Sequence, residues 1–374
     1  MKRYALCVAA VLAAALAAAG NAPAGGAHAK GPGPIQSNTD STTSLIPRFA
    51  PDLAVWLRAF SRVPPKVAPS PAPEPAATTT QTETTTTAAP AQPAKQPRPK
   101  QHLEGTTLSI YEHSAQPWVL AAQGCSAARR GENGIVILDF GMPAFRHHGY
   151  GTILFSGHFV RNHKITTAMV GYAEGYVSCL PIGSTASIVL ARGTSNYHPA
   201  VPSAYVAGVR WARATNRLGR ILLRKRLSTH VEAAAADDAE PAWDRRFRKT
   251  KQFFHGFRTA VHGHTLYDYG SLDGGVGAIW SARQAWYVAG GIRHTKALPE
   301  IYNSAMARQW AELARIAHGR YHRDVDFAGV MTQGSGSCRC GLRPHAAHRI
   351  LARALVAQGV VHVALPVGGT NIVG

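Results

Sequence analysis

Acidic side chains follow apolar, strand-like runs at several places in this sequence. Asp139 comes directly after the run "IVIL" at 135–138, Asp268 stands in "LYDYG", and Glu300 stands in "ALPEIYN". Two carboxyl groups placed across a glycosidic bond can hydrolyse it, one as a protonated general acid and the other as a base or nucleophile. A partly apolar site separates their pKa values, as this division of work requires. Asp139, Glu300 and Asp268 are therefore the candidate catalytic residues.

Amide and aromatic side chains occur near the same strand ends and could hydrogen-bond to a sugar or stack on its faces. The candidate substrate-binding residues are Asn196, Tyr267, Trp286, Tyr287 and Gln333. The structural alternative has equal standing, because a strand-end Asp often forms a turn or caps a helix and aromatic residues often belong to a core. The sequence contains no H-E-x-x-H, G-x-S-x-G or strand-linked G-x-G-x-x-G motif. We predict no metal and no cofactor.

Strand-like runs alternate with helical patterns throughout residues 105–374. This alternation predicts an α/β domain with a parallel sheet, in the form of a (β/α)8 TIM-like barrel, complete or irregular, and an open doubly wound sheet is the alternative. A barrel collects the carboxyl ends of its strands at one mouth, which would explain the position of Asp139. The runs expected to form strands are 135–138, 186–191, 221–223, 265–269, 285–290, 297–302, 327–332 and 360–365. The segments expected to form helices are 164–179, 202–214, 242–259, 305–317 and 346–358.

The N-terminal third has a different composition. Residues 1–29 combine a basic start, an apolar run rich in alanine and an "AHA" cleavage pattern, which is typical of a secretory signal peptide. The alternative is an uncleaved N-terminal anchor. Residues 30–62 predict a poorly structured segment, and residues 63–101 predict a Pro/Thr/Ala-rich linker with too little apolar surface to fold. The globular domain is then 105–374, and the protein is predicted to be secreted or associated with the cell envelope.

The chain is strongly basic, with a formal net charge of +20. Such a charge favours an anionic partner, and for an exported protein a cell-wall glycan or another anionic envelope polymer is a better candidate than nucleic acid. The alternative is that the many arginines reflect composition alone. We predict no membrane span after signal cleavage, and a monomer.

The cysteines indicate disulfides. Of five in the sequence, Cys7 lies in the signal peptide, and an even number in an exported chain permits pairing. The candidates are Cys125, Cys179, Cys338 and Cys340; Cys125 with Cys179 is one plausible pair, although connectivity cannot be deduced from sequence. The pattern "SCRCGLRPHAAH" also suggests zinc, but its C-x-C spacing and an oxidising compartment disfavour that interpretation.

Several segments resemble a family of exported, actinobacterial-type proteins of unknown activity. These segments are "GIVILDFGMPAF", "GYGTILFSG", "IVLARGTSNY", "LYDYGSLDGG", "AWYVAGG", "LPEIYNSAMARQW" and "FAGVMTQ", and the resemblance extends from Gly131 to the C-terminus. It implies a glycoside hydrolase-like barrel, remotely similar to the family 25 lysozyme-like group. The matching positions are Asp139, Asn196, Tyr267 and Glu300.

One departure from this family affects the expected function. The resemblance implies an acidic strand-end motif in the third unit, where this chain has "LLRKRLSTHVEAAAADDAEPAW", and we interpret that region as lacking the acid. Two functions are therefore open. One is a glycosidase-like enzyme that cleaves peptidoglycan or a related polysaccharide, and the other is a non-catalytic protein that binds cell-wall glycan on the same fold.

Overall fold

The computed structural model describes residues 106–198, 200–333 and 342–373. Its main sheet has eight strands in the order β10-β11-β1-β2-β6-β7-β8-β9, and neighbouring strands pair in parallel. These strands are β1 Thr106–Tyr111, β2 Gly134–Asp139, β6 Ile188–Gly193, β7 Val231–Asp237, β8 Leu266–Asp268, β9 Thr295–Ala297, β10 Val330–Thr332 and β11 Gly369–Val373. A second, antiparallel sheet consists of β3 Met142–Arg146, β4 Gly149–Ile153 and β5 Phe159–Arg161.

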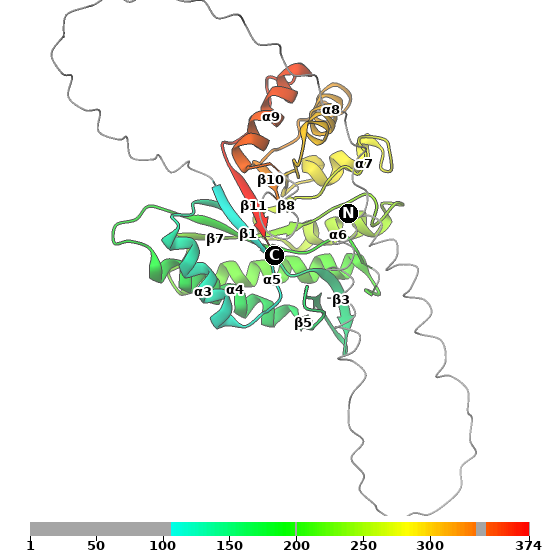
Figure 1. The fold of residues 1–374 in the computed structure, drawn as a ribbon. Coiled ribbons are helices and arrows are strands. Elements are labelled where there is room, and N and C mark those ends of the chain that lie inside the picture. Colours follow the sequence, from blue (N-terminus) through cyan, green and yellow to red (C-terminus); the bar gives the residue numbers. More distant parts are fainter. Residues whose placement is uncertain (1–105, 199, 334–341, 374) are drawn as a thin grey trace, which may run out of the picture. The chain divides into compact units, whose positions relative to one another are not determined.

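The main sheet is curled, and it brings the two ends of the domain together. Figure 1 shows the last strand, β11, beside the first, β1. The outermost strands, β9 and β10, form no continuous ladder with each other within the described residues. Among those residues, only two isolated parallel bridges, Ala297–Phe327 and Glu300–Met331, connect the segments around them. The predicted α/β class with a parallel sheet is confirmed, while the sheet is an incomplete barrel rather than a regular TIM barrel.

Helices connect successive strands and pack against the convex face of the sheet. They form neighbouring pairs, α3 with α4, α5 with α6 and α8 with α9 (Figure 1). The α-helices are α3 Pro117–Arg129, α4 Asn162–Cys179, α5 Ala204–Arg224, α6 Arg248–Ala260, α7 Ala282–Trp286, α8 Ser304–Tyr321 and α9 Pro344–Ala357, and α7 continues into a π-helical turn, Tyr287–Gly291. Side-chain caps set some helix starts: Ser203 accepts from Val206 N, and Asn303 accepts from Ala305 N and Met306 N.

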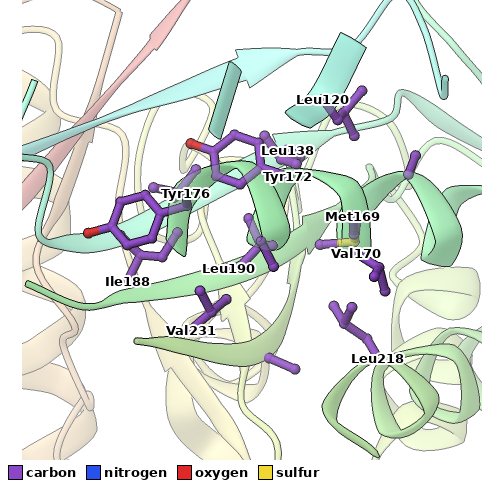
Figure 2. Packing of buried hydrophobic residues seen from close by; sticks show 14 of the residues in the cluster. Leu120, Leu138, Met169, Val170, Tyr172, Tyr176, Ile188, Leu190, Leu218 and Val231 are labelled. Carbon is purple, nitrogen blue, oxygen red and sulfur yellow. The ribbon is translucent and has the colours of Figure 1, made fainter. Parts of the chain in front are cut away.

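Alternating residues of each strand face opposite sides of the sheet. On the convex face, Leu138 and Leu190 join a core with Met169, Tyr172 and other side chains of α4 (Figure 2). The concave face has its own buried cluster, which includes Ile137, Ala191, Ala234, Ala236, Tyr267, Tyr269, Leu298, Met331 and Ile372. The strands are therefore buried on both faces, as parallel strands usually are.

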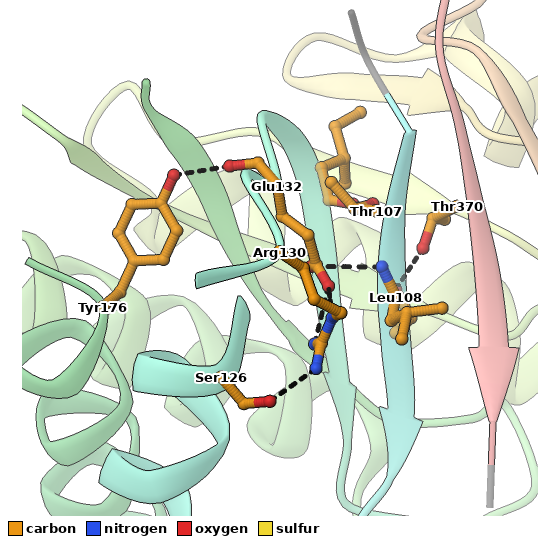
Figure 3. A network of polar contacts seen from close by, with 9 residues as sticks. Thr107, Leu108, Ser126, Arg130, Glu132, Tyr176 and Thr370 are labelled. Carbon is orange, nitrogen blue, oxygen red and sulfur yellow. Dashed lines mark hydrogen bonds and ion pairs between the residues drawn. The ribbon is translucent and has the colours of Figure 1, made fainter. Parts of the chain in front are cut away.

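A buried acid, Glu132, anchors the end of α3 to the first strand (Figure 3). Its carboxylate accepts hydrogen bonds from Arg130 Nε at 2.8 Å and from the backbone N–H of Leu108 at 3.2 Å, and its carbonyl accepts from the Tyr176 hydroxyl at 2.6 Å. Both the charge and the lone pairs of Glu132 are thereby satisfied, so its role is structural.

Three of the expected strands are wrong. Residues 221–223 lie inside helix α5, residues 285–290 belong to α7 and the π-helical turn, and residues 360–365 precede the true last strand, β11. Short apolar runs fit a buried helix as well as a strand, because periodicity does not separate the two over so few residues. The run at 297–302 is a strand only at its start, since β9 ends at Ala297.

The predicted pairing of Cys125 with Cys179 is confirmed, and this disulfide joins α3 to α4. Cys338 and Cys340, the signal peptide, the segment 30–62 and the linker 63–101 lie outside the described residues. Among the helices that are described, none is long and apolar enough to cross a bilayer.

Candidate functional site

Three buried carboxyl groups lie at the carboxyl ends of the strands on the concave side: Asp139 at the end of β2, Asp238 directly after β7 and Glu300 beyond β9. They are 2%, 8% and 6% exposed. Each stands two residues after a side chain of the concave core, namely Ile137, Ala236 and Leu298. Because side chains alternate along a strand, the same register that buries those apolar residues directs the three acids toward the mouth of the curled sheet.

Tyrosines surround these acids. Tyr302 donates a hydrogen bond to Oε1 of Glu300, and the Tyr269 hydroxyl, which donates to the Thr194 carbonyl at 3.2 Å, also lies within bonding reach of Asp139. Burial, followed by the negative charges of Glu300, Asp238 and Asp139, raises the pKa of Tyr111 well above its usual value. Tyr111 is therefore within electrostatic range of all three carboxyls.

The surroundings give the carboxyls different proton affinities. Burial raises the pKa of Asp139 to about 6, although hydrogen bonds from the Gly141 N–H and from Tyr269 lower it. Burial raises the pKa of Glu300 to about 8, against the hydrogen bond from Tyr302. Burial and then the nearby charges of Glu240, Glu300 and Asp139 raise the pKa of Asp238 well above normal. Both Asp139 and Glu300 act on Asp238, so the three form one electrostatic unit.

Further acids lie beside this unit. Burial raises the pKa of Asp268 to about 8, and burial and the charge of Asp268 raise the pKa of Asp237. Both oxygens of Asp237 are buried without a hydrogen-bond partner among the described residues. Glu240 accepts from the Ser271 hydroxyl at 3.1 Å, and Asp273 accepts from the Ala242 N–H at 2.6 Å. We call Asp139, Asp237, Asp238, Glu240, Asp268 and Glu300 the acidic cluster.

The acidic cluster contrasts with the basic chain around it. Within the described residues, none of its members forms an ion pair, and the ion pairs that are present join other acids, such as Glu132 and Glu174, to Arg130 and Lys225. Like charges that are buried together without cations cannot all ionise, so part of the cluster holds protons at neutral pH. Strongly shifted carboxyls at strand ends are typical of a functional site.

Two cavities lie away from the acidic cluster, among arginine and histidine side chains. One of about 500 Å³ is lined by Arg258 in the last turn of α6 and by His262, Arg293 and His294 in the loops before β8 and β9. Its surface is basic and open, with none of the convergent acids described above. Most side chains of the acidic cluster are buried. Solvent reaches this region at four half-buried side chains, those of Tyr111, Glu240, Tyr302 and Gln333. We place the candidate site at the acidic cluster because its carboxyl groups, with their shifted pKa values, could perform acid–base chemistry.

The structure brings some of the predicted residues together and leaves others apart. Asp139, Asp268 and Glu300 belong to the acidic cluster. Asn196 lies beside it, where its amide donates to the Glu240 carbonyl at 2.9 Å. Gln333 directly follows β10.

The predicted aromatic residues are placed differently. Tyr267 is in the concave core. The charges that act on its hydroxyl are those of Glu232 and Asp326 rather than those of the acidic cluster. Trp286 stacks on Tyr321, with ring centroids 4.9 Å apart, and Tyr287 packs on Phe247. The side chains of Trp286 and Tyr287 therefore serve packing between helices and loops.

The acid expected to be missing from the third unit is present. The region "VEAAAADDAE" contains strand β7, and its last residues supply Asp237, Asp238 and Glu240. The interpretation that this region lacks a strand-end acid is therefore wrong. An alanine run has low strand propensity, which hid β7 in the sequence. The two consecutive acids after four small, buried residues were the signal that could have revealed it.

Comparisons with protein-family models, with curated proteins and with solved structures found no match for this chain.

Proposed function

We propose that this chain is an exported cell-envelope enzyme that hydrolyses peptidoglycan or a related polysaccharide. The observation that supports this most is the pair of buried strand-end carboxyls with separated pKa values, about 6 for Asp139 and about 8 for Glu300. At neutral pH the first is ionised and the second is protonated. This is the combination that glycoside hydrolysis needs. An irregular (β/α)8 barrel would present both at one mouth.

In this mechanism Glu300 is the general acid. Its proton goes to the glycosidic oxygen as the bond to the leaving sugar breaks, and the Tyr302 hydroxyl positions the carboxyl. Asp139 is the base or nucleophile, held in place by the Gly141 N–H at 2.8 Å. Glu300 keeps its proton because burial, and then the nearby charge of Asp273, raise its pKa.

The test is release of reducing sugars from purified cell wall. Wild type should release them, and Asp139→Asn and Glu300→Gln should each lower the rate by about a hundredfold or more, because a positioned acid or base contributes 10²–10⁴-fold. Glu174→Gln, which changes an exposed acid on α4 that pairs with Lys225 at 2.7 Å, is the matched control and should leave the rate unchanged. Full activity of both cluster variants would overturn the assignment.

The near-complete burial of the acidic cluster favours a second function, a glycan-binding protein without catalysis. This alternative predicts that the protein sediments with insoluble wall while releasing no sugar from several glycans. Binding should then be unaffected by Glu300→Gln, since a buried carboxyl that does not react contributes little to recognition.

A further inference from the structure

A group of two histidines and an aspartate lies far from the acidic cluster. The side chains are those of His318 near the end of α8, Asp324 in the loop before β10, and His362 in the loop between α9 and β11. His318 lies fourteen residues after Ser304, the first residue of α8, which corresponds to about 21 Å along the helix axis. Because α8 starts on the side of Glu300, this group belongs to the opposite end of the sheet.

The three side chains direct their ligand atoms to one point. Nδ1 of His318 lies 2.8 Å from Oδ1 of Asp324, and Nε2 of His362 lies 3.0 Å from the same oxygen. The imidazole centroids are 3.8 Å apart. One nitrogen from each ring and one carboxylate oxygen all lie within 4.8 Å of one another. Among the described residues, this is the one group of at least three such side chains that meets that criterion.

We propose that His318, Asp324 and His362 bind a divalent transition-metal ion of the zinc class. Tetrahedral zinc holds nitrogen and oxygen ligands at about 2.0–2.2 Å, so its ligand atoms are about 3.3 Å apart, close to the spacing already present here. Imidazole ligands select zinc-like ions over magnesium and calcium, which prefer oxygen. Three protein ligands leave the fourth position for water. All three ligand residues are exposed, so an ion reaches the site from solvent.

The place of the site in the fold indicates what the metal does. Asp324 leads into β10 and His362 leads toward β11, while α8 carries His318. The metal therefore ties together the two connections next to the seam, where isolated bridges replace a continuous ladder between β9 and β10. A bound ion would stabilise this seam, because a ligand that binds only the folded state raises stability.

The test uses the full exported chain without a histidine tag and Zn²⁺ as the probe. Calorimetric titration should show one saturable equivalent, and Zn²⁺ should raise Tm by several degrees while Mg²⁺ and Ca²⁺ leave it unchanged. His318→Ala and His362→Ala should each weaken the site by about tenfold or more. His158→Ala, at an exposed histidine outside the group, is the matched control and should behave as wild type.

Two outcomes would overturn the proposal. One is wild-type protein without saturable Zn²⁺ binding. The other is a tight equivalent that persists in the double variant His318→Ala, His362→Ala, since the metal would then be held by other residues. Tm measured without metal shows whether each variant is folded, so loss of binding and loss of structure are distinguished.

Discussion

Asp237 and Asp268 are direct register partners on the adjacent parallel strands β7 and β8. Both are buried, and burial followed by the charge of Asp268 raises the pKa of Asp237 well above the usual value for an aspartate. Two buried acids side by side cannot both be ionised near neutral pH. The fold therefore holds at least one proton that the unfolded chain releases.

This pair predicts that stability falls as pH rises. Above the unfolded pKa near 4, the folded state binds more protons than the unfolded state, so unfolding becomes easier by about 1.4 kcal/mol per pH unit for each such carboxyl. Asp237→Asn should remove one carboxyl from this balance. Urea unfolding between pH 5 and 8 should then show a shallower decline than in wild type.

The control for Asp237→Asn is Glu232→Gln, an exposed acid on the same strand. Its slope with pH should equal that of wild type. An unchanged slope for Asp237→Asn would show that Asp237 ionises in the folded protein.

Activity, if the proposed hydrolysis is correct, should have a bell-shaped pH profile with its maximum near 7. The acid limb should lie at about 6, because Asp139 must lose its proton, and the alkaline limb at about 8, because Glu300 must keep its proton. The rate of sugar release, measured from pH 4 to 10, checks this.

Tyr302→Phe should move the alkaline limb of this profile to higher pH. The hydrogen bond from Tyr302 stabilises the ionised form of Glu300 and lowers its pKa, so its loss raises that pKa. Tyr321→Phe, at the end of α8, is the control and should leave both limbs in place. A shift of the alkaline limb to lower pH in Tyr302→Phe would contradict the assigned role of Glu300.

The contact between α5 and α6 predicts a steric effect at Gly208. A Cβ there would lie 2.0 Å from the carbonyl oxygen of Phe253, so Gly208→Ala must push the two helices apart. We expect a loss of about 1–3 kcal/mol in the free energy of unfolding. Gly319→Ala in α8, where a Cβ meets nothing within 4 Å, should instead stabilise by about 0.5–1 kcal/mol. Equal effects of the two substitutions in urea unfolding would contradict this packing.

The disulfide between α3 and α4 should contribute about 2–4 kcal/mol, because it closes a long loop in the unfolded chain. The double variant Cys125→Ser, Cys179→Ser should lose this amount, and a reducing agent should lower the urea midpoint of wild type. The same reductant should leave the variant unchanged. Wild type that is insensitive to reduction would show that the crosslink adds no stability.

The sequence predicted the class of fold and part of the site, and the reasons are local. Asp139 was predictable because four apolar residues before it form a strand that pairs on both sides with parallel neighbours. Asp238 was missed because β7 consists largely of alanine and gains its stability from burial on both faces, which no local propensity reports. The runs at 285–290 and 360–365 resemble strands because they are apolar. In the structure these apolar residues pack with helices α8 and α9 in a core outside the sheet.

The small residues of β7 have a consequence for how this chain can change. Ala236 is the register partner of Tyr267, and both belong to the concave core with Ala234 and Tyr269. Large rings on one strand occupy the volume that alanines on the next leave free. A larger side chain at position 236 therefore fits only if the side chain at position 267 becomes smaller. Among descendants of this sequence, residues 236 and 267 should therefore change together. Such paired changes would be evidence that β7 and β8 are neighbouring strands in this register.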